Sequence, residues 1–211
     1  MKGILAAGTF VVLAFVASAP ARAANILLPR AGQVGVGIQP LQYGGLANVG
    51  LVGAEFGSGF GLAVRLRYRT RYDRAAGISF ETRSLDGRGL LVTPSAFSRD
   101  TGPDSLVPLK SLTLQTFGVD LYQFYGARTR TPRFLSVSGG LAKINAIAGN
   151  GDAVYPIAGD GLFLGAGAGL ERFVYRSWAV DFSARYNAIF LDGSTNHDVQ
   201  VALGMIFYAA Y

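Results

Sequence analysis

In the last fifteen residues, 197–211, apolar side chains from Val199 onward alternate with mainly small or polar ones. One set of alternate positions is apolar throughout and ends the chain: Val199, Val201, Leu203, Met205, Phe207, Ala209 and Tyr211. A period of two residues is typical of a β-strand, because successive side chains point to opposite faces. A tilted strand of about 9–11 residues crosses a bilayer, so this segment is long enough to span a membrane.

The N-terminus has the pattern of an export signal. Lys2 precedes an apolar run that ends near Val16, and Ala21, Arg22 and Ala23 form a small-residue site of the A-x-A type. This order is typical of a secretory signal peptide, which we expect to be cleaved after Ala23. The alternative is an anchoring helix, but the run is shorter than the ~20 apolar residues that such a helix needs. Residues 24–211 are the expected mature domain.

The composition favours a membrane β-barrel over a helical membrane protein. Half of the residues are hydrophobic and 15% are charged, yet no stretch after residue 23 is long and apolar enough for a spanning helix. The apolar residues lie in short alternating segments. Without Lys2 and Arg22 the net charge falls from +6 to +4, which does not suggest a nucleic-acid binder. The absence of cysteine excludes disulfides and thiolate metal sites.

Seven further segments show the two-residue alternation, which predicts an all-β, up-and-down antiparallel barrel of eight strands. They are residues 33–39, 46–56, 62–69, 112–122, 135–141, 161–171 and 178–190. The first is expected to end at Pro40 and a turn at Tyr43-Gly44-Gly45. In the fourth the apolar phase slips by one residue, which suggests a bulge near Gln115.

Residues 73–110 interrupt this rhythm and hold several glycines and prolines. We therefore expect a long surface loop here, because long loops of membrane barrels lie on the cell surface and short turns on the periplasmic side. Residues 78–82 and 90–92 could form a hairpin in that loop; if they enter the bilayer instead, the barrel has ten strands. The expected periplasmic turns are 57–59, 127–133 and 175–177. Aromatic residues beside them predict an interfacial girdle: Phe56, Phe60, Tyr125, Phe134, Tyr175, Trp178 and Tyr211.

With these features the chain resembles the small outer-membrane barrels of the outer-membrane protein A and X type, which include opacity-like proteins. Residues 165–171 and 178–186 are closest to that family. The resemblance implies a monomer in the outer membrane of a Gram-negative cell. It also implies that Leu203, Met205, Phe207 and Tyr211 form a terminal signal read by the barrel assembly machinery, although the family more often ends in Phe.

Charged residues on the inner faces predict an ionic network. An eight-stranded barrel is just wide enough for its own side chains, and buried charges persist when they are paired. Three arginines can match three carboxylates: Arg65, Arg67 and Arg185 with Asp120, Glu171 and Asp181. We expect this network to fill the lumen; the alternative is a gated ion path along the same residues.

Arg69, Arg71 and Arg74 lie at the end of the third segment. If this is the outer rim, they would contact the phosphates of lipopolysaccharide, for which the guanidinium group is well suited. The alternative is that they are solvated or paired with Asp73 and Glu81.

An enzymatic function rests on His197, the only histidine, with Ser194 and Asp198 nearby. Barrels that deacylate lipid A present His and Ser on one strand, but the spacing required for that motif is missing here. Residues 165–169 lack the lysine and helix of a phosphate loop, and one histidine without cysteine makes a metal site improbable. We therefore expect neither catalysis nor a cofactor.

The sequence predicts a structural, adhesion or surface-recognition role through extracellular loops. A lipid A-modifying hydrolase and a small gated pore are alternatives. A soluble lipocalin-like barrel would instead place its apolar faces inward.

Overall fold

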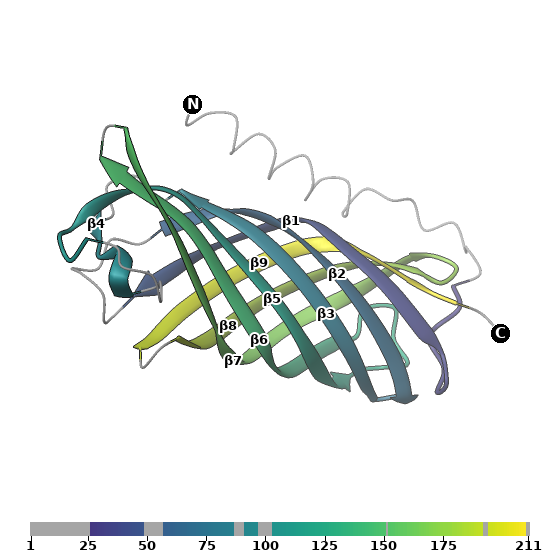
Figure 1. Cartoon of the computed structure of the whole chain (residues 1–211). Coiled ribbons are helices and arrows are strands. Elements are labelled where there is room, and N and C mark those ends of the chain that lie inside the picture. The colour runs from purple at the N-terminus through teal and green to yellow at the C-terminus, as the bar shows by residue number, and fades with distance from the viewer. Residues whose placement is uncertain are drawn as a thin grey trace.

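The computed structural model describes residues 26–48, 57–86, 91–96, 103–150, 152–191 and 194–209. Its elements, shown in Figure 1, are nine strands and one short 3₁₀ helix. They are β1 (Val34–Asn48), β2 (Gly57–Arg71), β3 (Arg74–Asp86), β4 (Leu91–Val92), η1 (Pro94–Ala96), β5 (Val107–Tyr125), β6 (Arg133–Asn150), β7 (Ala153–Tyr175), β8 (Trp178–Leu191) and β9 (Ser194–Tyr208). No helix among these residues is long and apolar enough to cross a membrane.

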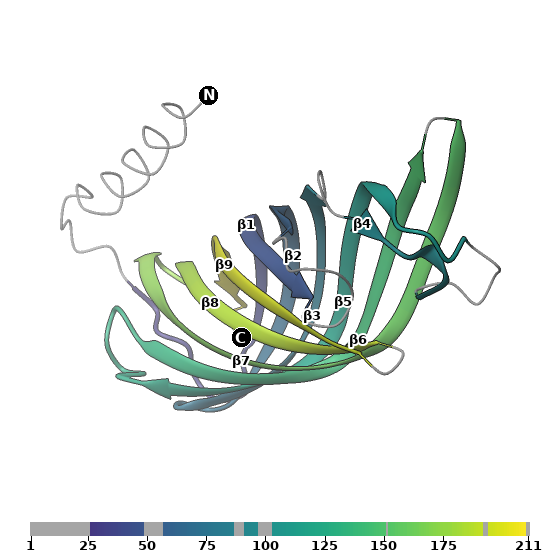
Figure 2. The ribbon, with the colours of Figure 1, turned by 90° about the vertical axis from the view of Figure 1, so that its left-hand side faces the viewer.

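Eight long strands close into an antiparallel ring. Each pairs with its neighbour in the chain, β1 pairs with β9, and β3 pairs with β5, so the two-residue strand β4 is left outside the ring beside the start of β5. Figure 1 and Figure 2 show this ring from the side and toward one mouth. The prediction of an eight-stranded up-and-down barrel is confirmed.

The ring is strongly staggered. Starting at Arg74 and stepping from each residue to its register partner around the ring leads back to β3 at Ser84, which is ten residues further along than residue 74. A stagger of this kind tilts the strands, typically by roughly 35–45° from the barrel axis. The tilt closes the sheet, so all backbone groups within the spanning part can find partners along the ring.

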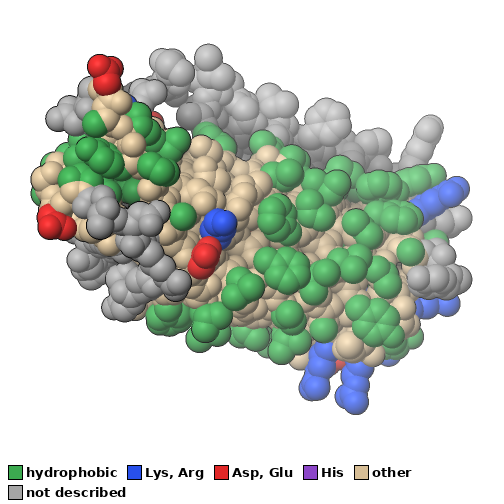
Figure 3. All heavy atoms as spheres, in the orientation of Figure 1, with side chains coloured by type: hydrophobic (Ala, Val, Ile, Leu, Met, Phe, Trp, Pro, Cys, Tyr) green, Lys and Arg blue, Asp and Glu red, His purple; other side chains and the backbone are tan. Residues whose placement is uncertain are grey.

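Side chains alternate between an apolar outer wall and a largely polar interior. On β2, Leu62, Val64 and Leu66 are 41–42% exposed, whereas Arg65 and Arg67 are 1–2% exposed. Figure 3 shows hydrophobic side chains spread over the outer surface. A soluble barrel would reverse this arrangement, and an apolar exterior around a polar interior is what a membrane barrel requires.

The first strand is longer than the sequence indicated. β1 continues through Pro40 to Asn48, with a register shift between Gln39 and Gln42, so the expected turn at Tyr43-Gly44-Gly45 is wrong. Proline is tolerated in a sheet at such a bulge. Residues 46–48 belong to β1 and residues 57–59 to β2, hence the separate strand predicted at 46–56 and the turn at 57–59 are also wrong. Residues 49–56 lie outside the described part of the chain.

The predicted long loop at 73–110 is also corrected. Residues 74–86 form β3 and residues 107–110 begin β5, so the connection outside the ring strands covers only residues 87–106. The ring still has eight strands because β3 takes the place of the strand expected at 46–56. The bulge near Gln115 is wrong too: the β5–β6 register is continuous from Ser111 to Tyr125, and Leu112 and Leu114 simply point inward.

The connections define two ends of the barrel. The turn end holds the start of β1, the end of β9 and the short turns at 72–73, 126–132 and 176–177; the loop end holds the other four connections. At the turn end Tyr125, Tyr175 and Trp178 are exposed, and Trp178 packs against Phe207 with ring centroids 5.0 Å apart.

Two residues of the predicted girdle lie elsewhere. Phe134 is buried in the interior, and Phe60 lies at the loop end against Tyr43. Phe56 and Tyr211 lie outside the described residues.

Two inward-facing glycines of β1 allow a matched test of the packing. A Cβ at Gly44 would overlap the guanidinium of Arg83 and lie 2.6 Å from the carbonyl oxygen of Val199, whereas a Cβ at Gly37 would lie 3.5 Å from its nearest atom. We expect Gly44→Ala to lower the free energy of unfolding by about 1–3 kcal/mol, as overpacking does. Gly37→Ala should be close to neutral. Urea unfolding of the barrel in lipid vesicles measures both, and equal effects would contradict the packing described.

Candidate functional site

Among the described residues the interior of the ring holds five arginines and five carboxylates, so the formal charges of these side chains balance. All ten side chains belong to residues that are at most 6% exposed: Arg65, Arg67, Arg69, Arg83, Arg185, Glu81, Asp120, Glu171, Asp181 and Asp198. Each of them forms at least one ion pair with another member. We call this set the ionic layer.

Glu171 of β7 is the centre of the ionic layer on the side of the turn end. It forms ion pairs with Arg67 and with Arg69 of β2, the latter at 2.9 Å. The hydroxyl of Tyr208 donates a hydrogen bond to its carboxylate at 2.9 Å. Arg67 also reaches Asp181 of β8 at 3.4 Å. Strands from opposite parts of the sequence are thereby joined across the lumen.

Glu81 of β3 is the centre of the middle part. Its carboxylate lies 2.9 Å from Arg65 and 3.6 Å from Arg185, and the amides of Gln42 and Gln200 donate to it at 3.0 and 2.9 Å. Arg185 in turn pairs with Asp120 at 3.0 Å. These additional donors satisfy the oxygens of a buried carboxylate, which an ion pair alone would not do.

The part of the ionic layer nearest the loop end is built on Asp198 of β9. Arg83 of β3 pairs with its carboxylate at 2.8 Å, and the amide of Asn187 donates to the same oxygen at 2.9 Å. Gly44 leaves the space that the guanidinium of Arg83 occupies.

Aromatic rings support the arginines on the side of the turn end. The guanidinium carbon of Arg67 lies 4.0 Å from the ring centre of Tyr122, and that of Arg69 lies 3.4 Å from the ring centre of Phe124. Cations over aromatic faces are stabilised by the ring quadrupole, more so when both are desolvated.

The turn end is closed by the segment before β1. Its Leu27 N–H donates to the carbonyl of Arg176 at 3.1 Å, and its Gly32 N–H donates to the carbonyl of Arg69 at 2.7 Å. Ile26 and Leu28 pack against the buried cluster of Phe173, Ala179, Ile206 and Tyr208. The segment therefore crosses this mouth and covers the ionic layer.

Toward the loop end the interior becomes apolar. The buried residues of this loop-end cluster are Leu46, Leu85, Val107, Leu109, Leu112, Leu114, Ala142, Ile144, Ala146, Ala148, Ile157, Phe163, Ile189 and Leu191. The lumen is thus packed with apolar side chains above the ionic layer as well as below it, which is the arrangement of a filled barrel.

All six residues predicted for the lumen network lie in the ionic layer, but some partners differ from the three-to-three matching expected. Four members were missed. Glu81 and Arg83 fell in the segment expected to be a loop, Arg69 was assigned to a rim, and Asp198 was considered only as a neighbour of His197. Counting inward positions of β3 with a two-residue period would have found Glu81 and Arg83.

The three arginines predicted at the outer rim lie elsewhere. Arg69 is buried in the ionic layer, and Arg71 and Arg74 flank the short turn at 72–73 at the turn end. This end is opposite the long connections, so the expectation that they lie at the rim beside the cell-surface loops is wrong. The error follows from the extra strand expected at 46–56, which reverses the direction assigned to β2.

The His197 arrangement is not a catalytic triad. His197 lies on the outer face, where its Nδ1 contacts the hydroxyl of Tyr186, while the adjacent Asp198 points inward to Arg83. Neighbouring residues of a strand face opposite sides, so the imidazole and the carboxylate cannot share a site. Among the described residues no group of three His, Cys, Asp or Glu side chains could hold a metal ion.

Of the predicted insertion signal, Leu203, Met205 and Phe207 lie on the outer face of β9, and Tyr211 lies outside the described residues.

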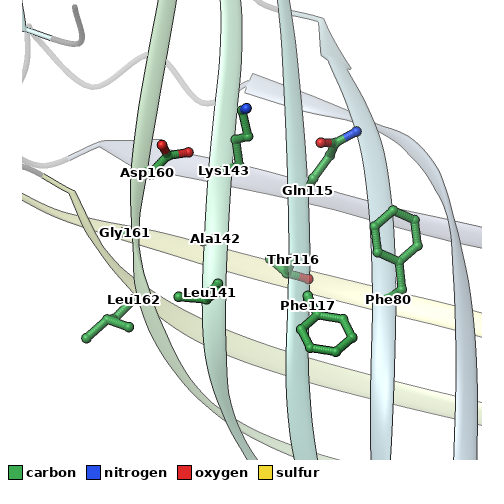
Figure 4. Close-up of a pocket in the computed structure, with 10 residues that line it drawn as sticks. All are labelled: Phe80, Gln115, Thr116, Phe117, Leu141, Ala142, Lys143, Asp160, Gly161 and Leu162. Atoms are coloured by element: carbon green, nitrogen blue, oxygen red, sulfur yellow. The ribbon is translucent and has the colours of Figure 1, made fainter. Parts of the chain in front are cut away.

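A hollow in the outer wall marks the boundary of its apolar band. Two cross-strand rows line it: Phe80, Phe117, Leu141 and Leu162 are apolar, and the next row contains Gln115, Lys143 and Asp160. Figure 4 shows both rows on neighbouring strands. The change from apolar to polar side chains indicates where hydrocarbon gives way to the headgroup region.

Breaking the ionic layer should be costly. We expect Glu171→Gln to lower the free energy of unfolding by about 3–5 kcal/mol, because it leaves the buried charges of Arg67 and Arg69 without their shared carboxylate. The matched variant Asp160→Asn, on the outer face, should change it by less than about 0.5 kcal/mol. Urea unfolding in vesicles compares them, and a small effect of Glu171→Gln would argue against the network.

The packed lumen also predicts the electrical behaviour of the protein. Purified barrel in a planar bilayer should show no steady single-channel openings, because the ionic layer lies between two apolar clusters. Sustained openings from the pure protein would instead support the gated ion path.

No protein-family model and no curated protein matches the chain. Among solved structures it is similar to neisserial surface protein A, with 12% identity and a TM-score of 0.58 over 83% of this chain and 95% of that one. It is also similar to Ail, the attachment invasion locus protein of Yersinia pestis, with 15% identity and a TM-score of 0.55 over 84% of this chain and 99% of that one. The chain therefore has the fold of the small eight-stranded outer-membrane β-barrels.

Proposed function

We propose that the protein is a surface-recognition protein of the outer membrane that binds a protein partner through a wall projecting from its loop end. The single observation that carries this proposal is the unequal height of the ring. β6 and β7 pair as far as Asn150 and Ala153, whereas the pairing of β7 with β8 begins only at Gly161 and Leu191. The β6–β7 hairpin therefore rises above its neighbour, as Figure 1 and Figure 2 show.

The projecting wall consists of the start of β5, the end of β6 and the start of β7, which rise above the ring, and it is a folded structure. Its inner face contributes Val107, Leu109, Ala146, Ala148 and Ile157 to the loop-end cluster, and β4 pairs with the start of β5. Burial of apolar surface stabilises it by roughly 25 cal/mol per Å². A rigid extension of this kind is not needed to span a bilayer, and it suits the presentation of a binding surface.

The outer surface of this end suits a protein better than an acidic polysaccharide. Ile147, Val154, Leu91 and Leu106 are 42–53% exposed, and exposed apolar side chains in water are typical of protein contacts. The described charges of the loop end are mainly acidic, with Asp86, Asp104, Asp152 and Asp160 against Lys110 and Lys143. This balance would repel heparin-like chains.

The comparisons support the fold and not the partner. Ail is named as an attachment protein, but at 15% identity the likeness extends only to the barrel. We propose no catalytic role, because Asp198 serves the ionic layer and faces away from His197.

Adherence of cells that display the protein tests this function. We expect wild-type cells to adhere to a coat of mixed extracellular-matrix proteins more strongly than to a heparin coat. The double variant Ile147→Ser and Val154→Ser should lower adherence about tenfold, since it removes apolar contacts of the size of binding hot spots. Both side chains face outward, so insertion should be normal by heat-modifiable gel migration.

The control variant is Ala158→Ser, which changes an exposed outward position of the same hairpin without removing a large apolar side chain. It should adhere like the wild type. Adherence of the double variant at the wild-type level, or wild-type adherence to neither coat, would count against the proposed function.

A further inference from the structure

The two ends of the barrel carry opposite charge. Among the described residues the turn end holds one carboxylate, Asp73, and eight arginines. These are Arg30, Arg71, Arg74, Arg128, Arg130, Arg133, Arg172 and Arg176. On the face drawn in Figure 3 most of the basic side chains lie at one end of the molecule and the acidic ones mainly toward the other. Since the ionic layer is neutral, this excess of positive charge is a property of the turn end alone.

Three of these arginines continue the outer wall. Arg74, Arg133 and Arg172 occupy outward positions of β3, β6 and β7, two residues from outward apolar side chains such as Leu135 and Leu170. We call them the arginine collar. Long cationic side chains at the edge of an apolar surface extend their charged ends toward the lipid headgroups.

Aromatic side chains place the collar at the membrane interface. Arg133 is the register partner of Tyr125, which is 54% exposed, and Tyr175 and Trp178 are exposed on the neighbouring hairpin. Exposed tyrosine and tryptophan are enriched at the headgroup level of membrane proteins. The guanidinium groups of the collar therefore lie where the phosphates of the surrounding leaflet lie.

The collar has no anionic partner within the described part of the protein. The ion pairs found there are formed within the ionic layer. Asp73, the carboxylate at this end, accepts a hydrogen bond from the side-chain amide of Gln123. The guanidinium groups of the collar are consequently available to a ligand, and a guanidinium matches a phosphate group geometrically.

We propose that the arginine collar binds the phosphate groups of anionic glycerophospholipids in the leaflet around the turn end. Because short turns of such barrels face the periplasm, this is the inner leaflet of the outer membrane. A lipid is the occupant that fits, because its acyl chains would contact the apolar wall while its phosphate meets the collar. A soluble acidic protein would meet only the charge. This inference does not depend on the proposed recognition function.

The positive charge continues beneath the rim. Arg30 and Arg128 line a hollow of about 500 Å³ together with Tyr72 and the apolar residues Leu27 and Pro29. The collar is therefore part of a basic surface that extends from the lipid-facing wall to the underside of the barrel, which adds to its attraction for an anionic leaflet.

Spin-label measurements of lipid selectivity test the proposal. The folded barrel is placed in phosphatidylcholine vesicles with a trace of spin-labelled phosphatidylglycerol or spin-labelled phosphatidylcholine, and the motionally restricted fraction of each label is compared. We expect the wild type to bind phosphatidylglycerol more strongly than phosphatidylcholine. The relative affinity should be about fivefold at a lipid site that contains one collar arginine. The triple variant Arg74→Gln, Arg133→Gln and Arg172→Gln should lose this preference, and added salt should weaken it in the wild type.

The matched control is Lys143→Gln, which removes an outward cation near the loop end and should keep the preference. If the triple variant does not fold by gel migration, the three single variants are measured instead, and each should lose part of the preference. A wild type without selectivity, variants that keep it, or a control that loses it equally would overturn the proposal.

Discussion

The pairing of arginines with carboxylates inside a closed ring is the interaction on which the rest of this structure depends. The outer wall is apolar, so the polar side chains of each strand must lie within the ring, where charges persist when paired. Glu171 and Glu81 each bind two arginines from other strands. The strands are thus held together across the lumen as well as along the sheet, and the same side chains fill the middle part of the lumen.

The strands that could be predicted are those whose two faces differ most in chemistry. On β2 and β8 arginine, aspartate and serine alternate with large apolar residues, so the period is plain in the sequence. β3 was predicted only as residues 78–82 of a possible hairpin, because its outward face includes Thr82 and Ser84 and its inward face includes Ala75 and Leu85. Where both faces are mixed, periodicity does not identify a strand, and the topology and the members of the ionic layer on β3 were lost with it.

The inward leucines of β5 show a second limit of the sequence pattern. Leu112 and Leu114 suggested that the apolar positions of the strand shift by one residue, because every apolar side chain was assumed to face lipid. Both side chains are in fact buried in the interior. Above the membrane the outer face of a strand contacts water. There the inner face of the projecting wall is the face that excludes water, and it is therefore apolar. Alternation identifies the two faces of a strand, but the surrounding solvent decides which face is apolar. The bulge predicted near Gln115 was therefore a change of environment along a part of β5 whose register is continuous.

The net positive charge of the whole chain is modest, but its charged side chains are unevenly distributed between the two ends of the barrel. Because the ionic layer contributes no net charge, the excess arginines are concentrated at the turn end, and the described loop end is mainly acidic. Short turns stay on the side from which a barrel inserts, so arginines placed there need not cross hydrocarbon, where each would cost roughly 2–4 kcal/mol at mid-depth. Arg74, Arg133 and Arg172 can then hold the barrel against leaflet phosphates while the opposite end projects into water.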